Sequence, residues 1–167
     1  MKRLITAIII AAVTIAATAQ KMPRFFNISP GMTFGQIDKQ TEKLGLKSDY
    51  TLEFFAGATV RFYYGSLLGS LAYIYILEEA AGAAESLLFY IADDGKSTFQ
   101  KCKEQFIDYD KKGYDITDEA GQEYSGIDET GKAFSVTNEY LYDIKFVSIL
   151  ITSNMVRTLM SINKYQQ

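Results

Sequence analysis

The chain of 167 residues has no histidine, no tryptophan, two prolines and a single cysteine. Without histidine, the Ser-His-Asp and Cys-His mechanisms and most catalytic zinc sites are excluded. Cys102 has no second cysteine with which to form a disulfide within the chain, and we expect it to be a small core residue rather than a reactive thiol. The sequence predicts no cofactor and no metal site.

Basic residues are not in excess either. Lysine and arginine number 17 against 20 aspartates and glutamates, so the formal net charge is −3. No basic stripe is present, which argues against a nucleic acid as the partner.

The N-terminus has the three parts of a secretory signal peptide. Met1-Lys2-Arg3 is basic, residues 4–17 are apolar, and small residues precede a cleavage site after Ala19. The apolar run is short for a membrane span of about 20 residues, which disfavours the alternative of an uncleaved anchor. We therefore predict a signal peptide at 1–19, a periplasmic or extracellular location, no stable membrane insertion after cleavage, and a single domain at 20–167.

Two stretches, 33–46 and 97–114, share one helical pattern. Each opens with a capping-box sequence, in which an N-cap hydroxyl (Thr33 or Ser97) is followed three residues later by glutamine. Apolar residues then recur at steps of three and four, which places them on one side of a helix. Each stretch closes with a glycine after a basic residue, as in a Schellman C-terminus. The sequence predicts one helix used twice, the second about a turn longer.

The segments after these helices have the hydrophobic period of strands. Strands are predicted at 50–55, 59–64, 70–77, 122–127, 132–137, 142–152 and 156–164, with an acidic loop at 115–121 and a turn at 138–139. Residues 78–91 fit either a helix or a loop followed by a strand, and the second is favoured. The predicted fold class is α+β, with two tandem helix-then-antiparallel-strand units, at about 30–92 and 93–167, that form a sheet with the helices on one face.

Two stretches partly match ligand-binding loops. Asp108, Asp110, Gly113 and Glu119 match positions of a calcium loop, but Lys112 stands where an oxygen ligand is needed. Residues 94–97 resemble the end of a phosphate-binding loop that lacks its first glycine. Neither pattern carries a functional prediction.

Acidic residues gather in three predicted turns. They are Asp93 with Asp94, Asp115 with Asp118 and Glu119, and Asp128 with Glu129. Aspartate is common in turns for backbone reasons. Two such carboxylates converging in a cleft would instead support the alternative function, a small carboxylate-dependent hydrolase acting on an envelope polymer.

Aromatic residues are abundant, with 12 tyrosines and 11 phenylalanines. In the strand at 59–64, Arg61 and Tyr63 lie opposite an apolar face of Val60, Phe62 and Tyr64. In the next strand Tyr73 and Tyr75 share a face. Tyrosine and arginine are enriched in binding hot spots, although tyrosine also packs at sheet edges with its hydroxyl in water. We predict Arg61, Tyr63, Tyr73 and Tyr75 as binding residues and no catalytic residue.

Several of these patterns together resemble a known family. They are residues 30–34 (Pro-Gly-Met-Thr-Phe) opening the first helix, Phe55-Ala56-Gly57, the alternation at 60–64 and the C-terminal segment 156–165. With them the chain resembles the small exported proteins of Bacteroides-type bacteria that have a β-lactamase-inhibitor-protein-like fold. The resemblance implies tandem helix-plus-sheet units, an envelope or secreted location, and protein binding.

The expected function is therefore that of an exported binding or interaction module without catalysis. Its role is expected to be inhibitor-like or related to envelope assembly, and its partner is expected to be another protein. The sequence leaves the oligomeric state open.

Overall fold

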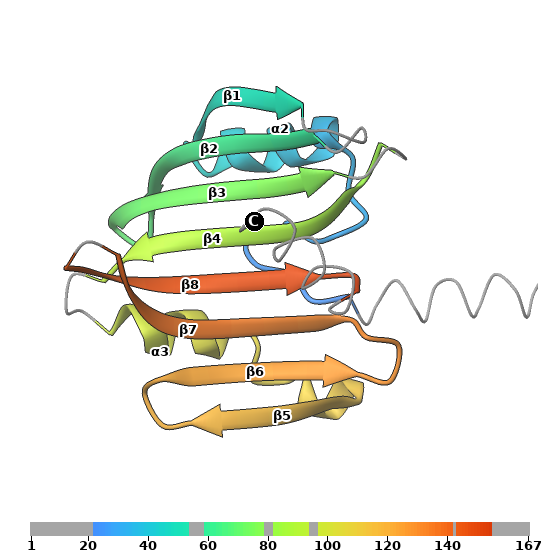
Figure 1. The fold of residues 1–167 in the computed structure, drawn as a ribbon, viewed down its shortest axis with the longest axis vertical. Coiled ribbons are helices and arrows are strands. Elements are labelled where there is room, and N and C mark those ends of the chain that lie inside the picture. The colour runs from blue at the N-terminus through green and yellow to red at the C-terminus, as the bar shows by residue number, and fades with distance from the viewer. Residues whose placement is uncertain (1–21, 54–58, 79–81, 94–96, 142, 155–167) are drawn as a thin grey trace, which may run out of the picture.

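The computed structural model of the protein describes residues 22–53, 59–78, 82–93, 97–141 and 143–154. Its main element is one antiparallel sheet of eight strands in the order β1-β2-β3-β4-β8-β7-β6-β5 (Figure 1). The strands are β1 (Lys47–Glu53), β2 (Thr59–Leu67), β3 (Ser70–Glu78), β4 (Ala84–Ala92), β5 (Tyr114–Glu119), β6 (Glu123–Asp128), β7 (Ala133–Leu141) and β8 (Ile144–Thr152). The first four and the last four strands are each a meander, and the two meanders join where β4 pairs with β8.

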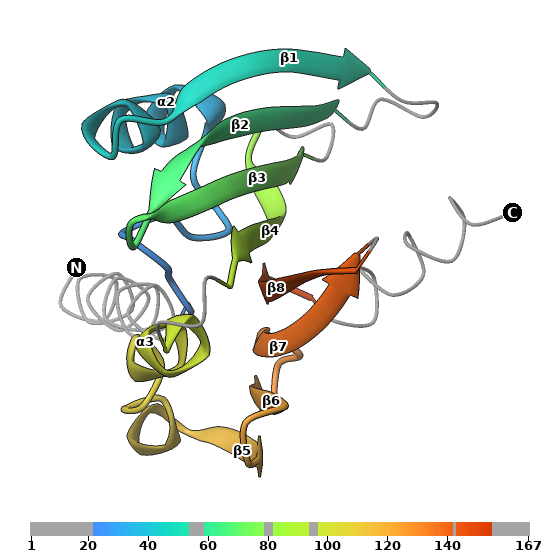
Figure 2. The same ribbon diagram turned by 90° about the vertical axis from the view of Figure 1, so that its left-hand side faces the viewer.

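Two α-helices, α2 (Phe34–Lys43) and α3 (Thr98–Glu104), accompany the sheet, together with the 3₁₀-helix η1 (Asp110–Lys112). Figure 2 shows that α2 and α3 lie on the same side of the sheet. We call this side the covered face and the opposite side the open face. Among the described residues, no helix is long and apolar enough to cross a membrane.

The predicted fold class is wrong, because strands dominate the structure. Each of the eight strands has six to nine residues, whereas α2 and α3 have only 10 and 7. β4 and β8 pair without interruption from Ser86↔Thr152 to Ala92↔Phe146. The sheet is therefore continuous and is not divided into two helix-plus-strand units. The physical reason is that β4 and β8 carry apolar residues on both faces, which only the centre of one large sheet can bury.

The two helix starts differ although their sequences match. At α2 the predicted capping box is confirmed, since the Gln36 amide donates to Thr33 Oγ1 at 3.3 Å and the Thr33 amide donates to Gln36 Oε1 at 2.9 Å. Ser97 precedes α3 in a left-handed conformation, with φ 61°, and its side chain forms no such cap. The prediction that the second helix is longer is also wrong. After Glu104 the chain continues in turns and the 3₁₀-helix, not as α-helix.

Both predicted Schellman ends are confirmed. Gly45 (φ 72°) and Gly113 (φ 83°) take left-handed conformations that cost glycine little. The amide of the following residue reaches back five positions in each case, from Leu46 to the Thr41 carbonyl at 2.9 Å and from Tyr114 to the Tyr109 carbonyl at 3.2 Å.

The strand predictions hold in part. Residues 84–92 form a strand, which decides between the two interpretations of 78–91. The predicted loop at 115–121 is wrong for residues 115–119, which belong to β5, and the predicted turn at 138–139 is wrong because both residues lie inside β7. Pairing with a neighbouring strand satisfies the backbone of these polar segments, which their side chains alone do not indicate. The predicted signal peptide at 1–19 and the strand at 156–164 lie outside the described residues.

The hydrophobic core lies between the sheet and the helices of the covered face. Phe25 and Ile28 of the N-terminal segment, Phe106 after α3 and Phe134 of β7 are each fully buried there. The core prediction for Cys102 is confirmed, since its side chain is fully buried as a free cysteine. Burial is the main cause that raises the pKa of its thiol to about 12, so the thiolate is suppressed at neutral pH.

Candidate functional site

The structure separates the four predicted binding residues into two pairs. The pairings Arg61↔Ile76 and Tyr63↔Ile74 place Arg61 and Tyr63 on the covered face, because Ile74 and Ile76 belong to the core. Tyr73 and Tyr75 alternate with these isoleucines and therefore lie on the open face. Phe62 and Tyr64, on the apolar side of β2, therefore lie on the open face. α2 contacts the polar side of β2 instead, because its Asp38 provides a partner for Arg61 and Tyr63.

Asp38 joins α2 to β2 through two charge-assisted hydrogen bonds. Tyr63 Oη donates to Asp38 Oδ1 at 2.5 Å, and Arg61 Nη1 donates to Asp38 Oδ2 at 2.7 Å. The Arg61 guanidinium also lies over the Phe34 ring, 4.3 Å from its centroid. Burial, and then the bond to Asp38, raise the pKa of the Tyr63 phenol above its ordinary value. This arrangement holds a helix against the sheet, and it leaves Tyr63 only 1% exposed.

Replacing Tyr63 by phenylalanine tests this network. At neutral pH the variant is expected to lose about 1–2 kcal/mol of unfolding free energy, because a buried hydroxyl no longer donates to a carboxylate. The raised pKa means that the folded protein holds the phenol proton more tightly than the unfolded chain does. The contribution of this proton to stability is therefore complete below pH 10.0, the ordinary value, and is lost as the pH rises above it. Urea unfolding from neutral pH to about pH 11 is expected to show a smaller alkaline loss of stability in the variant than in the parent.

Tyr64→Phe is the matched control, since Tyr64 is the next residue but lies on the open face with 37% exposure. It is expected to change the unfolding free energy at neutral pH by less than about 0.5 kcal/mol. If the free energy of unfolding fell with rising pH as steeply in Tyr63→Phe as in the parent, Tyr63 would hold its proton no more tightly in the folded protein than in the unfolded chain.

The open face carries a continuous band of aromatic side chains. Phe62 occupies its centre, and its ring lies 5.2 Å from Tyr50, 5.8 Å from Tyr73 and 4.9 Å from Tyr75 between centroids. From Tyr75 the ring contacts continue to Tyr90 at 6.0 Å and from there to Phe146 at 6.3 Å. These distances are typical of stacked and edge-to-face aromatic pairs. Together with Tyr64, which pairs with Tyr73, the aromatic face consists of Tyr50, Phe62, Tyr64, Tyr73, Tyr75, Tyr90 and Phe146.

The aromatic face is most accessible over β1, β2 and β3. Tyr50 is 45% exposed, Tyr64 and Tyr75 are each 37% exposed, and Leu71 beside them is 50% exposed. Burial is the first cause that raises the pKa of the Tyr75 phenol, followed by the neighbouring Tyr50 and Tyr73. The Tyr75 phenol is therefore neutral at physiological pH and presents a polar tip on an apolar body.

Charge is distributed unevenly over the open face. By strand alternation, the open-face positions of β2, β3, β4 and β8 hold no charged residue in the described part of the chain. The open-face positions of β5, β6 and β7 hold the four acidic residues Asp115, Glu119, Glu123 and Glu139. These three strands contain no lysine or arginine. An uncharged aromatic region over β2, β3, β4 and β8 thus adjoins an acidic half on one side, and on the other side it is bordered by the exposed Lys47 of β1, which pairs with the open-face residue Tyr64.

The prediction from sequence missed five members of the aromatic face, namely Tyr50, Phe62, Tyr64, Tyr90 and Phe146. The alternation of Phe62 and Tyr64 with Arg61 and Tyr63 was visible in the sequence, but alternation does not show which face of the strand the helix covers. Tyr90 and Phe146 lie on strands that become neighbours only through the β4–β8 pairing. Their contact could not be read from local periodicity.

The acidic residues that would support a hydrolase are dispersed. Asp93 forms an ion pair with Lys145 at 2.7 Å, and Asp118 forms one with Lys103 of α3 at 2.6 Å on the covered face. Asp128 Oδ1 accepts hydrogen bonds from Thr130 and from the Lys132 amide within its own turn. Asp94 lies outside the described residues. These contacts assign structural roles to Asp93, Asp118 and Asp128.

Glu119 lines a hollow of 430 Å³ at one end of β5, β6 and β7 together with Glu123 and Lys145. In the described ranges, no group of three or more cysteine or acidic side chains is arranged to hold a metal ion.

Comparison with known proteins adds no assignment. No family model, no curated protein and no solved structure matches the chain. The functional argument therefore rests on the aromatic face and its surroundings.

Proposed function

We propose that this protein is an exported binding module that acts without catalysis and holds another protein on its aromatic face. The observation that carries the proposal is the band of ring contacts that runs over β1, β2, β3, β4 and β8 on the open face. Large aromatic side chains with polar tips supply most of the binding energy at protein interfaces, at low cost in conformational entropy. An inhibitor-like or envelope-assembly role is the form that this function would take in an exported protein.

The charge pattern specifies the kind of partner. The uncharged aromatic region over β2, β3, β4 and β8 suits an apolar patch on the partner, because Lys47 lies only at its β1 border and no charge within the region would have to be buried without a counterion. The acidic residues Glu119, Glu123 and Glu139 border this region and favour basic side chains beside that patch. We therefore propose a partner protein with an apolar docking surface flanked by lysine or arginine.

The test has two steps: candidate partners are first isolated and purified, and their affinities for the parent and the variants are then measured. Residues 20–167 are used to isolate candidate proteins from envelope extract and medium, and each candidate is then titrated against the parent and the variants by calorimetry. Tyr64→Ala combined with Tyr75→Ala is expected to weaken binding at least tenfold, equivalent to about 1.4 kcal/mol. Glu123→Gln combined with Glu139→Gln is expected to weaken binding less and to reduce its salt dependence.

Tyr140→Ala is the matched control, because Tyr140 is the most exposed of the tyrosines that the structure describes, at 71%, and lies outside the aromatic face. It is expected to bind like the parent. Equal affinities for the parent and the Tyr64/Tyr75 variant would contradict the proposal, and so would a partner that binds only through the covered face. If the protein instead associates with itself and this association requires Tyr64 and Tyr75, the molecule bound to the aromatic face is a second copy of the chain and not a different protein.

A further inference from the structure

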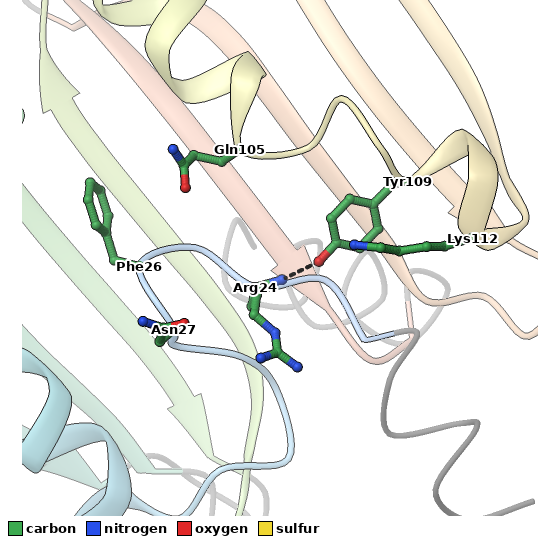
Figure 3. A pocket seen from close by; sticks show the side chains of 6 residues that line it. All are labelled: Arg24, Phe26, Asn27, Gln105, Tyr109 and Lys112. Atoms are coloured by element: carbon green, nitrogen blue, oxygen red, sulfur yellow. Dashed lines mark hydrogen bonds between the residues drawn. The ribbon is translucent and has the colours of Figure 1, made fainter.

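A second hollow lies on the covered face of the sheet, between the N-terminal segment and the residues that connect α3 to η1. It has a volume of 450 Å³. Its lining residues are Arg24, Phe26, Asn27, Gln105, Tyr109 and Lys112 (Figure 3). This volume is in the range of small-molecule sites and exceeds the space that a single inorganic ion occupies.

The lining is cationic. Arg24 and Lys112 contribute two positive charges, Asn27 and Gln105 contribute carboxamide donors, and none of the described lining residues is a carboxylate. Neither Arg24 nor Lys112 forms an ion pair with a residue that the structure describes. These two cations line one hollow in a chain of net charge −3. They give the lining a positive charge, which Asp108 offsets in part because its carboxylate interacts electrostatically with Lys112, and a positively charged concave site concentrates anions.

The acidic residues nearest in sequence are engaged elsewhere. Asp108 Oδ1 accepts a hydrogen bond from Lys111 Nζ at 2.8 Å, and Asp110 Oδ1 accepts one from the Lys111 amide. Lys112 instead places its ammonium over the Tyr109 ring, 3.7 Å from the centroid. This contact orients Lys112 without neutralising it, since the ring carries no net charge.

The frame of the hollow is fixed before any ligand enters. Phe25 and Ile28 exchange two backbone hydrogen bonds of 2.9 Å, and both side chains are fully buried. Between them Phe26 (φ 48°) and Asn27 (φ 61°) are both held in left-handed conformations. Such strain persists only where the surrounding structure imposes it. On the opposite wall, the Tyr109 hydroxyl accepts the Arg24 amide at 3.2 Å (Figure 3).

We propose that this hollow binds a small organic anion. Arg24 and Lys112 hold the oxyanion group, a carboxylate, sulfonate or phosphate, and the carboxamides of Asn27 and Gln105 donate further hydrogen bonds. The rings of Phe26 and Tyr109 flank the apolar part of the ligand. The site lies on the covered face and is independent of the aromatic face.

Benzoate is the probe, and benzamide is its neutral counterpart of nearly the same shape. Residues 20–167, labelled with ¹⁵N, are titrated with each compound at constant ionic strength, and amide shifts are followed by NMR. Benzoate is expected to give saturable shifts confined to the residues around the hollow, and benzamide is expected to give none. In Arg24→Gln combined with Lys112→Gln, the benzoate shifts are expected to disappear or to saturate at a concentration at least tenfold higher.

Lys39→Gln combined with Lys43→Gln removes two exposed positive charges of α2, none of whose residues lines the hollow, and serves as the control for net charge. It is expected to bind benzoate like the parent.

Equal shifts with benzamide, or unchanged benzoate binding in the Arg24/Lys112 variant, would overturn the site. Equal affinity for inorganic phosphate would overturn its assignment to an organic anion. Since Arg24 and Lys112 are exposed, both variants are expected to fold, and their amide spectra report this directly. Tyr64 and Tyr75 are unchanged in every variant, so failure here leaves the proposed protein-binding function untouched.

Discussion

Replacing Phe134 by alanine is expected to lower the free energy of unfolding by about 4 kcal/mol. Phe134 is fully buried, and its ring stacks on Phe106 with centroids 4.5 Å apart. The rings of Tyr109, Tyr114 and Tyr124 surround it at 5.4, 5.9 and 5.9 Å. Alanine would leave a cavity that these rings cannot close, because each is held by a different element. Urea unfolding monitored by tyrosine fluorescence and circular dichroism measures the loss.

Tyr140→Ala provides the comparison, because it truncates an aromatic residue of the same strand that is 71% exposed. Its effect is expected to stay within about 0.5 kcal/mol. A loss below about 1.5 kcal/mol for Phe134→Ala would mean that the site collapses and that the aromatic cluster does not anchor β5, β6 and β7 to the covered side.

Gly126→Ala is expected to destabilise the protein by about 2 kcal/mol through steric conflict alone. A Cβ atom on Gly126 would meet Phe134 Cε1 at 2.6 Å and Ile116 Cδ1 at 2.8 Å. Alanine in a strand normally gains about 0.5–1 kcal/mol over glycine, so the sign of the result decides which effect is larger. The rigid Phe134 ring cannot yield as a flexible chain end would, and we expect the conflict to prevail.

Two further variants separate the steric effect from backbone propensity. Gly35→Ala makes the same substitution in α2, where nothing lies within 4 Å of the added atom, and it is expected to stabilise by about 0.5–1 kcal/mol. Phe134→Leu gives the added methyl group room, so Gly126→Ala is expected to cost at least about 1 kcal/mol less in that background. Additive effects in this double-mutant cycle would contradict a direct clash.

The sequence alone determined much of the local structure. The capping box at Thr33, the Schellman ends at Gly45 and Gly113, and the burial of Cys102 were predicted correctly, since each depends on residues a few positions apart. Most strands were also identified, because the alternation of their side chains is a local signal. The same local pattern gave a wrong prediction at Ser97. A hydroxyl residue followed three positions later by glutamine also stands there, but Ser97 has a left-handed conformation and its side chain does not cap the helix.

Tertiary structure decided the fold class and the composition of the candidate sites. The pairing of β4 with β8 joins two meanders into one sheet and thereby brings Tyr90 beside Phe146, residues 56 positions apart in the numbering. The face of β2 that α2 covers was decided by the bonds of Asp38 to Arg61 and Tyr63, which turn Phe62 and Tyr64 to the open face. Arg24 and Lys112 meet only because the N-terminal segment packs against the chain after α3. Hydrophobic periodicity reports which residues share a face of an element, but the partner of that face is set by long-range packing, which local periodicity does not encode.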